Sequence, residues 1–152
     1  MNGLELRPIT ADDIEFARVM RNANRDSFID NREVSPAQQA EWFSALQNKP
    51  HVDFRIIWLD GVRVGTMSAT THSDGSREIG NGTVHEDYRG RGIATAAESA
   101  LADPNVRCWG TYFPDNPAAA VVMRRAGFDP IPIHRDMQHE HRHDQPPTVD
   151  RE

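Results

Sequence analysis

The chain has 152 residues, 38% of them hydrophobic, which is enough for one domain with a core and too little for two. Its formal net charge of −6 argues against a nucleic-acid partner, which requires clustered Lys and Arg, and no apolar run is long enough to span a membrane. The single cysteine, Cys108, excludes an intrachain disulfide and indicates a cytoplasmic protein, in which Cys108 is expected to be a small buried hydrophobe.

The chain begins with the pattern of a strand followed by a helix. Apolar and polar residues alternate over residues 4–9, as in a strand with one buried face. A helix is expected from Thr10, because its hydroxyl can cap the first turn and the Asp13 side chain can bond back to the capping residue. This helix should end near Asn24. Its predicted apolar stripe consists of Phe16, Val19, Met20 and Ala23.

A second helix is predicted after an aperiodic loop over residues 25–34. Ser35 is the expected cap, Pro36 takes the first helical position and Gln38 completes a capping box. The apolar face of this helix is formed by Trp42, Phe43 and Leu46.

Three antiparallel strands are predicted next. Residues 54–59 are rich in β-branched and aromatic side chains and stop at Asp60-Gly61, a dipeptide typical of a hairpin turn. Residues 62–70 form the return strand, and a second turn leads into a third strand over residues 78–84.

A Gly-rich turn follows the third strand. Gly90 and Gly92 remove side chains where the backbone can approach a ligand, and a helix expected over residues 92–102 points its unpaired N–H groups at the same place. Such a turn binds phosphate. The alternative is an ordinary Gly-containing connection between a strand and a helix.

The remaining elements are a strand, a short helix and an edge strand. The strand over residues 106–112 should lie parallel to residues 78–84, because a helix crosses over between them. Asn116-Pro117 begins the short helix and Gly127 ends it. Residues 128–135 belong at a sheet edge, since two prolines there cannot donate to a ladder.

The polar tail, residues 136–152, has almost no apolar content and is expected to be disordered. Its three alternate histidines, His139, His141 and His143, have the spacing of a chelator. They lack the accompanying cysteine or carboxylate pattern, so no metal is predicted.

Two motifs of this chain are similar to those of a known family. Arg89, Gly92 and Ala94 fit the form Gln/Arg-x-x-Gly-x-Gly/Ala, and residues 116–128 fit an Asn-x-x-Ala/Ser segment that ends in Gly-Phe. With the order of elements, these motifs make residues 4–128 resemble the GNAT N-acetyltransferase superfamily. The resemblance implies a single α/β (α+β) domain over residues 1–135, with a mostly antiparallel sheet, a central splayed pair of parallel strands and helices on both faces.

The same resemblance implies acetyl-CoA as co-substrate, with its pantetheine arm in the slot between the splayed strands. Backbone N–H groups of the turn would hold the pyrophosphate, Arg89 or Arg91 would add charge-assisted contacts, and Asn116 would bind pantetheine. Either arginine could instead be a solvated surface charge. The implied coenzyme-binding residues are Val84, Arg89, Gly90, Arg91, Gly92, Ile93, Ala94, Thr95 and Asn116.

Acetyl transfer to an amine needs a base, because an alkyl ammonium has a pKa of about 10. Relatives often place a Tyr acid where this chain has Met123 and a Glu where it has Thr111, so the chain departs from the family at both positions. The remaining candidates are Glu78 and His85 as bases and Tyr112 as acid. Each candidate also has a purely structural alternative. Glu78 could be an exposed charge at the start of a strand, His85 a solvated loop histidine, and Tyr112 a packed strand aromatic.

Residues 21–43 resemble the subgroup that includes amino-sugar and ribosomal-protein N-acetyltransferases. Arg21, Arg25 and Trp42 are the residues that could grip a phosphate or a sugar ring, although Trp42 on a helix stripe also suits a core. The predicted function is acetyl transfer to a primary amine of a small molecule, such as an amino sugar. The alternatives are a peptide N-terminal acetyltransferase and a non-catalytic acyl-CoA-binding domain. The short last strand leaves a homodimer possible.

Overall fold

The computed structural model describes residues 1–135, so the predicted disordered tail and its histidines lie outside the described residues. One six-stranded sheet has the order β1-β2-β3-β4-β5-β6. Strands β1 to β4 are antiparallel neighbours, β5 is parallel to β4, and β6 is parallel to β5. The strands are β1 (Leu4–Pro8), β2 (Val52–Leu59), β3 (Val62–Thr71), β4 (Arg77–Val84), β5 (Cys108–Tyr112) and β6 (Asp129–Pro132).

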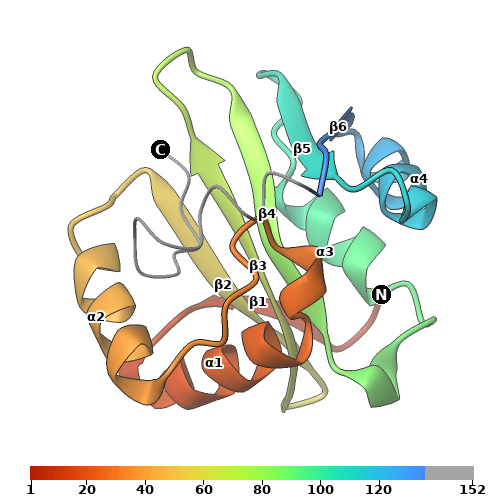
Figure 1. The fold of residues 1–152 in the computed structure, drawn as a ribbon. Coiled ribbons are helices and arrows are strands. Elements are labelled where there is room, and N and C mark those ends of the chain that lie inside the picture. Colours follow the sequence, from red (N-terminus) through yellow and green to blue (C-terminus); the bar gives the residue numbers. More distant parts are fainter. Residues whose placement is uncertain (136–152) are drawn as a thin grey trace.

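Helices cover both faces of the sheet (Figure 1), as the sequence predicted. The first two helices pack together on one face, and the last two pack together on the other. The α-helices are α1 (Ile14–Ala23), α2 (Pro36–Leu46), α3 (Ile93–Leu101) and α4 (Pro117–Ala126). Short 3-10 turns are η1 (Ala11–Asp13), η2 (Arg25–Ser27) and η3 (Glu86–Tyr88).

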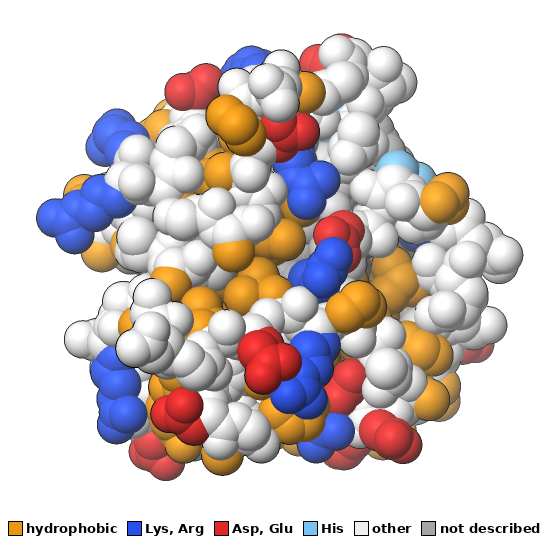
Figure 2. Space-filling view, turned by 180° about the vertical axis from the view of Figure 1, so that it is seen from behind, with side chains coloured by type: hydrophobic (Ala, Val, Ile, Leu, Met, Phe, Trp, Pro, Cys, Tyr) orange, Lys and Arg blue, Asp and Glu red, His pale blue; other side chains and the backbone are white. Residues whose placement is uncertain are grey.

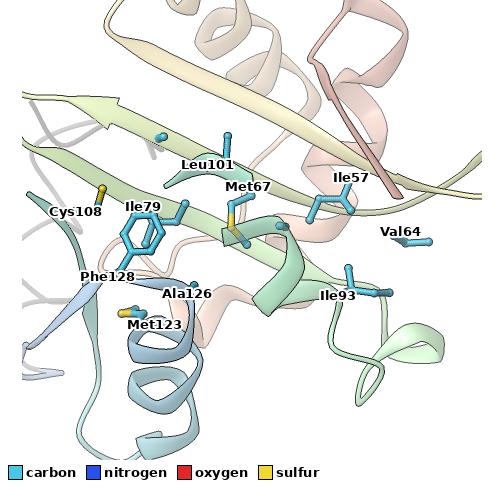
Figure 3. Packing of buried hydrophobic residues seen from close by; sticks show 12 residues of the cluster. Ile57, Val64, Met67, Ile79, Ile93, Leu101, Cys108, Met123, Ala126 and Phe128 are labelled. Atoms are coloured by element: carbon cyan, nitrogen blue, oxygen red, sulfur yellow. The ribbon is translucent and has the colours of Figure 1, made fainter. Parts of the chain in front are cut away.

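Two hydrophobic cores lie on the two faces, and adjacent residues of β2 show why. Ile56 and Ile57 are both fully buried, yet Ile56 packs with α1 and α2 whereas Ile57 packs with the core beneath α3 and α4. This follows from the period of two in a strand, which sends successive side chains to opposite faces. Figure 3 shows the second core, in which Met123 and Phe128 lie near Ile79 and Cys108. Cys108 is buried there, as expected.

The apolar stripe predicted for α1 is wrong at two positions. Val19 is 51% exposed and Ala23 is also exposed, whereas Ala17, Met20 and Arg21 are buried. The buried face therefore runs through an arginine, which a hydrophobic pattern passes over. Both expected N-terminal signals are present, since Thr10 N–H donates to Asp13 Oδ2 at 2.8 Å and Ser35 forms its capping box with Gln38.

Figure 2 views the molecule from behind Figure 1 and shows positive and negative side chains interspersed over that face. A nucleic-acid-binding surface instead gathers Lys and Arg. Within residues 1–135 no helix is both long enough and apolar enough to cross a membrane.

Candidate active site

Strands β4 and β5 are paired at only two positions, and this produces the cleft. Arg77 lies opposite Cys108 and Glu78 opposite Trp109, after which the strands part. The expected splayed parallel pair is therefore present. The space between the strands is a cleft of about 800 Å³, whose walls come from β3, β4, β5, α3, α4 and residues 27–30.

A β-bulge in β4 shapes one wall of the cleft. Thr66 pairs with Thr83 and Ser68 with Gly80, so Asn81 and Gly82 together lie opposite one residue of β3. Asn81 has a left-handed backbone, with φ of 55°, and its side-chain amide donates to Ser68 Oγ at 2.7 Å. A bulge takes backbone groups out of the ladder, and here the Asn81 carbonyl accepts instead from the Thr66 hydroxyl at 2.7 Å. The Gly-Asn-Gly sequence inside a strand pattern is a signal for a bulge that the sequence reading missed.

The Gly-rich turn enters α3 with an open backbone. Gly90 and Gly92 have φ values of 76° and 78°, a region that L-residues with side chains rarely adopt. Among residues 1–135, nothing lies within 4 Å of a side-chain position at Gly90, and at Gly92 only the Met1 terminal methyl is near, at 4.0 Å. The first N–H groups of α3 have no intrahelical acceptor and carry a partial positive charge. The turn therefore fits an anionic group such as a pyrophosphate.

Both arginines of the turn form contacts that hold the turn in place. Arg89 donates from Nε to the Val84 carbonyl at 3.2 Å and from Nη2 to Asn24 Oδ1 at 3.0 Å. Arg91 donates to the Asp87 carbonyl at 3.2 Å, and its guanidinium lies over the Tyr88 ring. Each guanidinium has five N–H groups, so donors remain for a ligand.

The structure gathers some of the predicted site residues at the cleft and not others. Those that line it are Glu78, Val84, Ala94, Tyr112 and Asn116. His85 is not in the lining, and its Nδ1 accepts a bond from the Asp87 N–H at 3.1 Å. The side chain of Ile93 is buried in the core, so only its backbone can meet a ligand.

Glu78 is a fixed, buried carboxylate at the point where β4 and β5 part. It is only 5% exposed, which sets aside the reading of an exposed strand-start charge. Its Oε1 lies 2.9 Å from His72 Nε2. The His72 ring stacks on Trp109 at 5.2 Å, and Trp109 donates to Ser76 Oγ at 3.0 Å. The sequence reading missed His72, which follows the end of β3.

The cleft contains one of the two tyrosines of the chain. Tyr112 and Thr111 line it at the end of β5, and Met123 reaches it from α4 while packing in the core. Tyr88 packs instead against Arg91 and His85 in the glycine turn.

Only one of the three acceptor candidates lines the cleft. Arg21 does so from α1. Arg25 is exposed and lies 3.9 Å from Glu33. Trp42 is buried in the core under α1 and α2, edge-on to Phe54 with the ring centroids 4.9 Å apart.

Glu98 is a further cleft residue that the sequence reading did not single out. It lies one helical turn after Ala94, on the same face of α3, and both line the cleft. Glu98 is 5% exposed, and burial raises its pKa to about 7. Among residues 1–135, no three side chains of His, Cys, Asp or Glu come together as a metal site.

The parted strands, the bulge and the glycine turn at a helix N-terminus define an α/β domain built to bind an extended, anion-bearing ligand. A family model described as an acetyltransferase (GNAT) domain matches residues 3–129. The chain therefore belongs to the GNAT acetyltransferase family, as the two motifs predicted, and is an acyltransferase domain.

Solved structures support the same fold. Aminoglycoside acetyltransferase AAC(6')-Ib with coenzyme A and kanamycin is 19% identical with a TM-score of 0.69, over 82% of this chain and 83% of that one. RimL, a ribosomal alpha-N-protein acetyltransferase with coenzyme A, is 18% identical with a TM-score of 0.70, over 83% and 80%. A Vibrio cholerae spermidine N-acetyltransferase with CoA and spermine is 14% identical with a TM-score of 0.71, over 84% and 81%. A search of curated protein sequences gives no significant match.

The raised pKa of Glu98 predicts a specific dependence of stability on pH. The folded chain keeps a proton on Glu98 that the unfolded chain loses above pH 4.5, so this residue makes the free energy of unfolding fall as pH rises from about 4.5 to 7. Glu98→Gln should remove that loss, which is on the order of 3 kcal/mol for such a shift. Urea unfolding of both proteins at pH 5 and pH 8 measures it. Equal pH slopes for the two proteins would contradict the assignment.

Proposed function

We propose that this GNAT domain transfers an acetyl group directly from acetyl-CoA to a primary amine of a small molecule. The observation that carries the proposal is one continuous arrangement. The cleft between β4 and β5 is lined by Val84 and Ala94, the residues on either side of the glycine turn, and buried Glu78 stands where those strands meet.

Acetyl-CoA supplies the acetyl group as an activated thioester. For it the chain offers backbone N–H groups over residues 90–95 for the pyrophosphate, with additional donors from Arg89 and Arg91. Beyond Glu78 and Trp109, β4 and β5 no longer pair with each other, and an extended chain laid between them can bond their backbones as a neighbouring strand would. Asn116, at the start of α4, lines the same path.

The chemistry assigned to the chain's own residues is proton transfer and charge stabilisation. Glu78 takes a proton from the acceptor ammonium, directly or through one water, so that the neutral amine attacks the thioester carbonyl. His72 holds the Glu78 carboxyl in place. The main chain of β4 near Val84, which lines the cleft, polarises the thioester carbonyl oxygen, where negative charge develops. Tyr112 protonates the departing sulfur in place of the Tyr that Met123 replaces.

His85 is the second candidate base. Its Nδ1 accepts a hydrogen bond from the Asp87 N–H, and its place outside the cleft lining favours Glu78 for the role.

A small acceptor is favoured over a peptide by a bridge between two cleft walls. Arg135 follows β6 and donates to the Asp26 carbonyl in η2 at 2.6 Å, while it also pairs with Asp115 before α4. This bridge narrows the approach that a peptide N-terminus needs. The solved neighbours were crystallised with amines as different as kanamycin and spermine, so the family fold itself does not choose the acceptor.

Two other expectations stay proposals. A second copy of the chain can extend the sheet at β6, a four-residue edge strand with Pro130 and Pro132, and sedimentation at high protein concentration would detect such a homodimer. A cytoplasmic location rests on the single cysteine, and fractionation of cells would reveal a different one.

Coenzyme binding is predicted to require the open backbone at Gly92. Gly92→Glu puts a carboxylate where an anion is held, so acetyl-CoA should raise the melting temperature of the natural chain and not of the variant. Gly61→Glu is the matched control, because Gly61 has the same left-handed backbone, with φ of 79°, in the β2–β3 hairpin. It should lose stability but keep the full response to acetyl-CoA. Loss of the response in both variants would show a general folding defect instead.

Acceptor-dependent release of CoA thiol is predicted to depend on Glu78. Glu78→Gln cannot accept the proton, and kcat should fall by about 10²–10⁴-fold with little change in acetyl-CoA binding. Stopped assays with a thiol reagent measure the rate over a panel of amino sugars, diamines and peptides. His85→Gln and Tyr112→Phe run in parallel, and a loss confined to His85→Gln would move the base there. Tight acetyl-CoA binding with no thiol release for any amine would support the non-catalytic alternative.

A further inference from the structure

Arg21 is a buried cation in the wall of the cleft. It is 4% exposed and lies on the last turns of α1. Its Nη2 donates to the Asp30 carbonyl at 3.0 Å. Its Nη1 is buried and has no hydrogen-bond partner among residues 1–135. A polar group in that condition costs stability unless something else binds it.

The nearby carboxylates are hydrogen-bonded to other side chains. Both oxygens of the Asp30 carboxylate bind Arg32, at 3.0 and 2.7 Å. Asp30 bonds Arg21 through its carbonyl, and its carboxylate acts on Arg21 by charge attraction alone. Elsewhere in the cleft, Glu78 is held by His72, and Arg135 has Asp115 as its partner. Arg21 thus differs from Arg135, the other arginine of the lining, in having no carboxylate bonded to it within the described residues.

The surroundings of Arg21 reduce the cost of its charge without neutralising it. Its guanidinium lies 4.2 Å from the centre of the Phe28 ring, a contact that favours a cation. Burial lowers the pKa of Arg21 to about 10, so the group still carries its charge at neutral pH. A buried cation of this kind is strongly unfavourable unless it is paired, and binding of an external anion would pair it.

We propose that Arg21 binds an oxyanion group, carboxylate or phosphate, carried by the amine acceptor. The inference rests on the proposed acetyl transfer and adds the acceptor's chemical class, an amine that also bears an acidic group. The position supports the acceptor as the source of the anion. Arg21, Phe28 and Asp30 form the wall contributed by α1 and the segment after it, whereas the phosphate-binding turn lies before α3. An unpaired cation there also repels acceptors that are only positively charged.

The test compares acceptors that differ only in the acidic group. The pairs are ethanolamine with phosphoethanolamine, glucosamine with glucosamine 6-phosphate, and propylamine with β-alanine, so that the phosphate and carboxylate sources are separated. Spermine is the purely cationic arm. For the natural chain, kcat/KM should favour the anionic member of at least one pair by about tenfold to a hundredfold, which is the value of one charge-assisted hydrogen bond.

Arg21→Gln should abolish that preference by raising KM for the anionic acceptor, with the neutral acceptor and acetyl-CoA affinity little changed. Arg21→Lys keeps the positive charge but loses the planar, bidentate guanidinium. Its preference for the anionic acceptor should lie between those of the natural chain and Arg21→Gln, and it serves as the test variant if Arg21→Gln is unstable. Arg25→Gln is the matched control, because it removes an exposed positive charge four residues away, outside the cleft lining. It should retain the preference.

A binding measurement separates failure of this inference from failure of the proposed reaction. Calorimetric titration of phosphoethanolamine and β-alanine into the CoA-saturated protein should show saturable binding that Arg21→Gln loses and Arg25→Gln keeps. Such binding without thiol release for any amine would support the anion site and overturn the acetyl transfer. Thiol release with no anionic preference, or a preference that survives Arg21→Gln, would overturn the anion site alone. Reduced acetyl-CoA affinity in Arg21→Gln would show that Arg21 binds the coenzyme, and this result would also overturn the proposed anion site for the acceptor.

Discussion

The parting of β4 and β5 after two paired residues is the constraint on which the rest of the structure depends. Backbone N–H and C=O groups inside a protein need partners, and a sheet normally supplies them along the whole strand. Here the β4–β5 ladder stops at Glu78 and Trp109, and the cleft lies between the strands beyond them. The separation is stable because α3 and α4 pack together on one face of the sheet and the shared core holds Ile79, Met123 and Phe128.

Local signals in the sequence were sufficient for most of the fold. Capping residues, proline at helix starts and Asp-Gly at a hairpin depend on neighbours within four residues, and each element they predicted is present. The glycine turn was also predictable, because the positive φ values at Gly90 and Gly92 strongly favour glycine. The parallel relation of β4 and β5 followed from the helix between them.

The chemistry of the site was less readable, for a physical reason. Whether Arg21 faces the core or solvent depends on which side of α1 meets the sheet, and a charged residue in a buried stripe defeats a hydrophobic count. The pairing of His72 with Glu78 joins two strands through a turn, and the burial of Glu98 needs α4 in place. These are contacts between elements, which a single sequence does not contain.

The cleft contains a few charged groups, each in a defined environment. Where β4 and β5 part, the cleft has a carboxylate bonded to a histidine, and it also has a glutamate, Glu98, whose pKa burial raises to about 7. Its outer wall has an arginine bonded to a carbonyl and not to a carboxylate. Low polarity around such groups strengthens each interaction with a bound molecule, so a few charges can orient a small substrate where many exposed ones would not.

One hydrogen bond described above joins the glycine turn to the end of α1. Arg89 of the glycine turn donates to Asn24, the residue that ends α1, three positions after Arg21. The contact therefore connects the turn to the helix end that carries Arg21. A side-chain contact of this kind is one route by which occupancy of one binding site alters affinity at another, and any such coupling of binding free energies is equal in both directions.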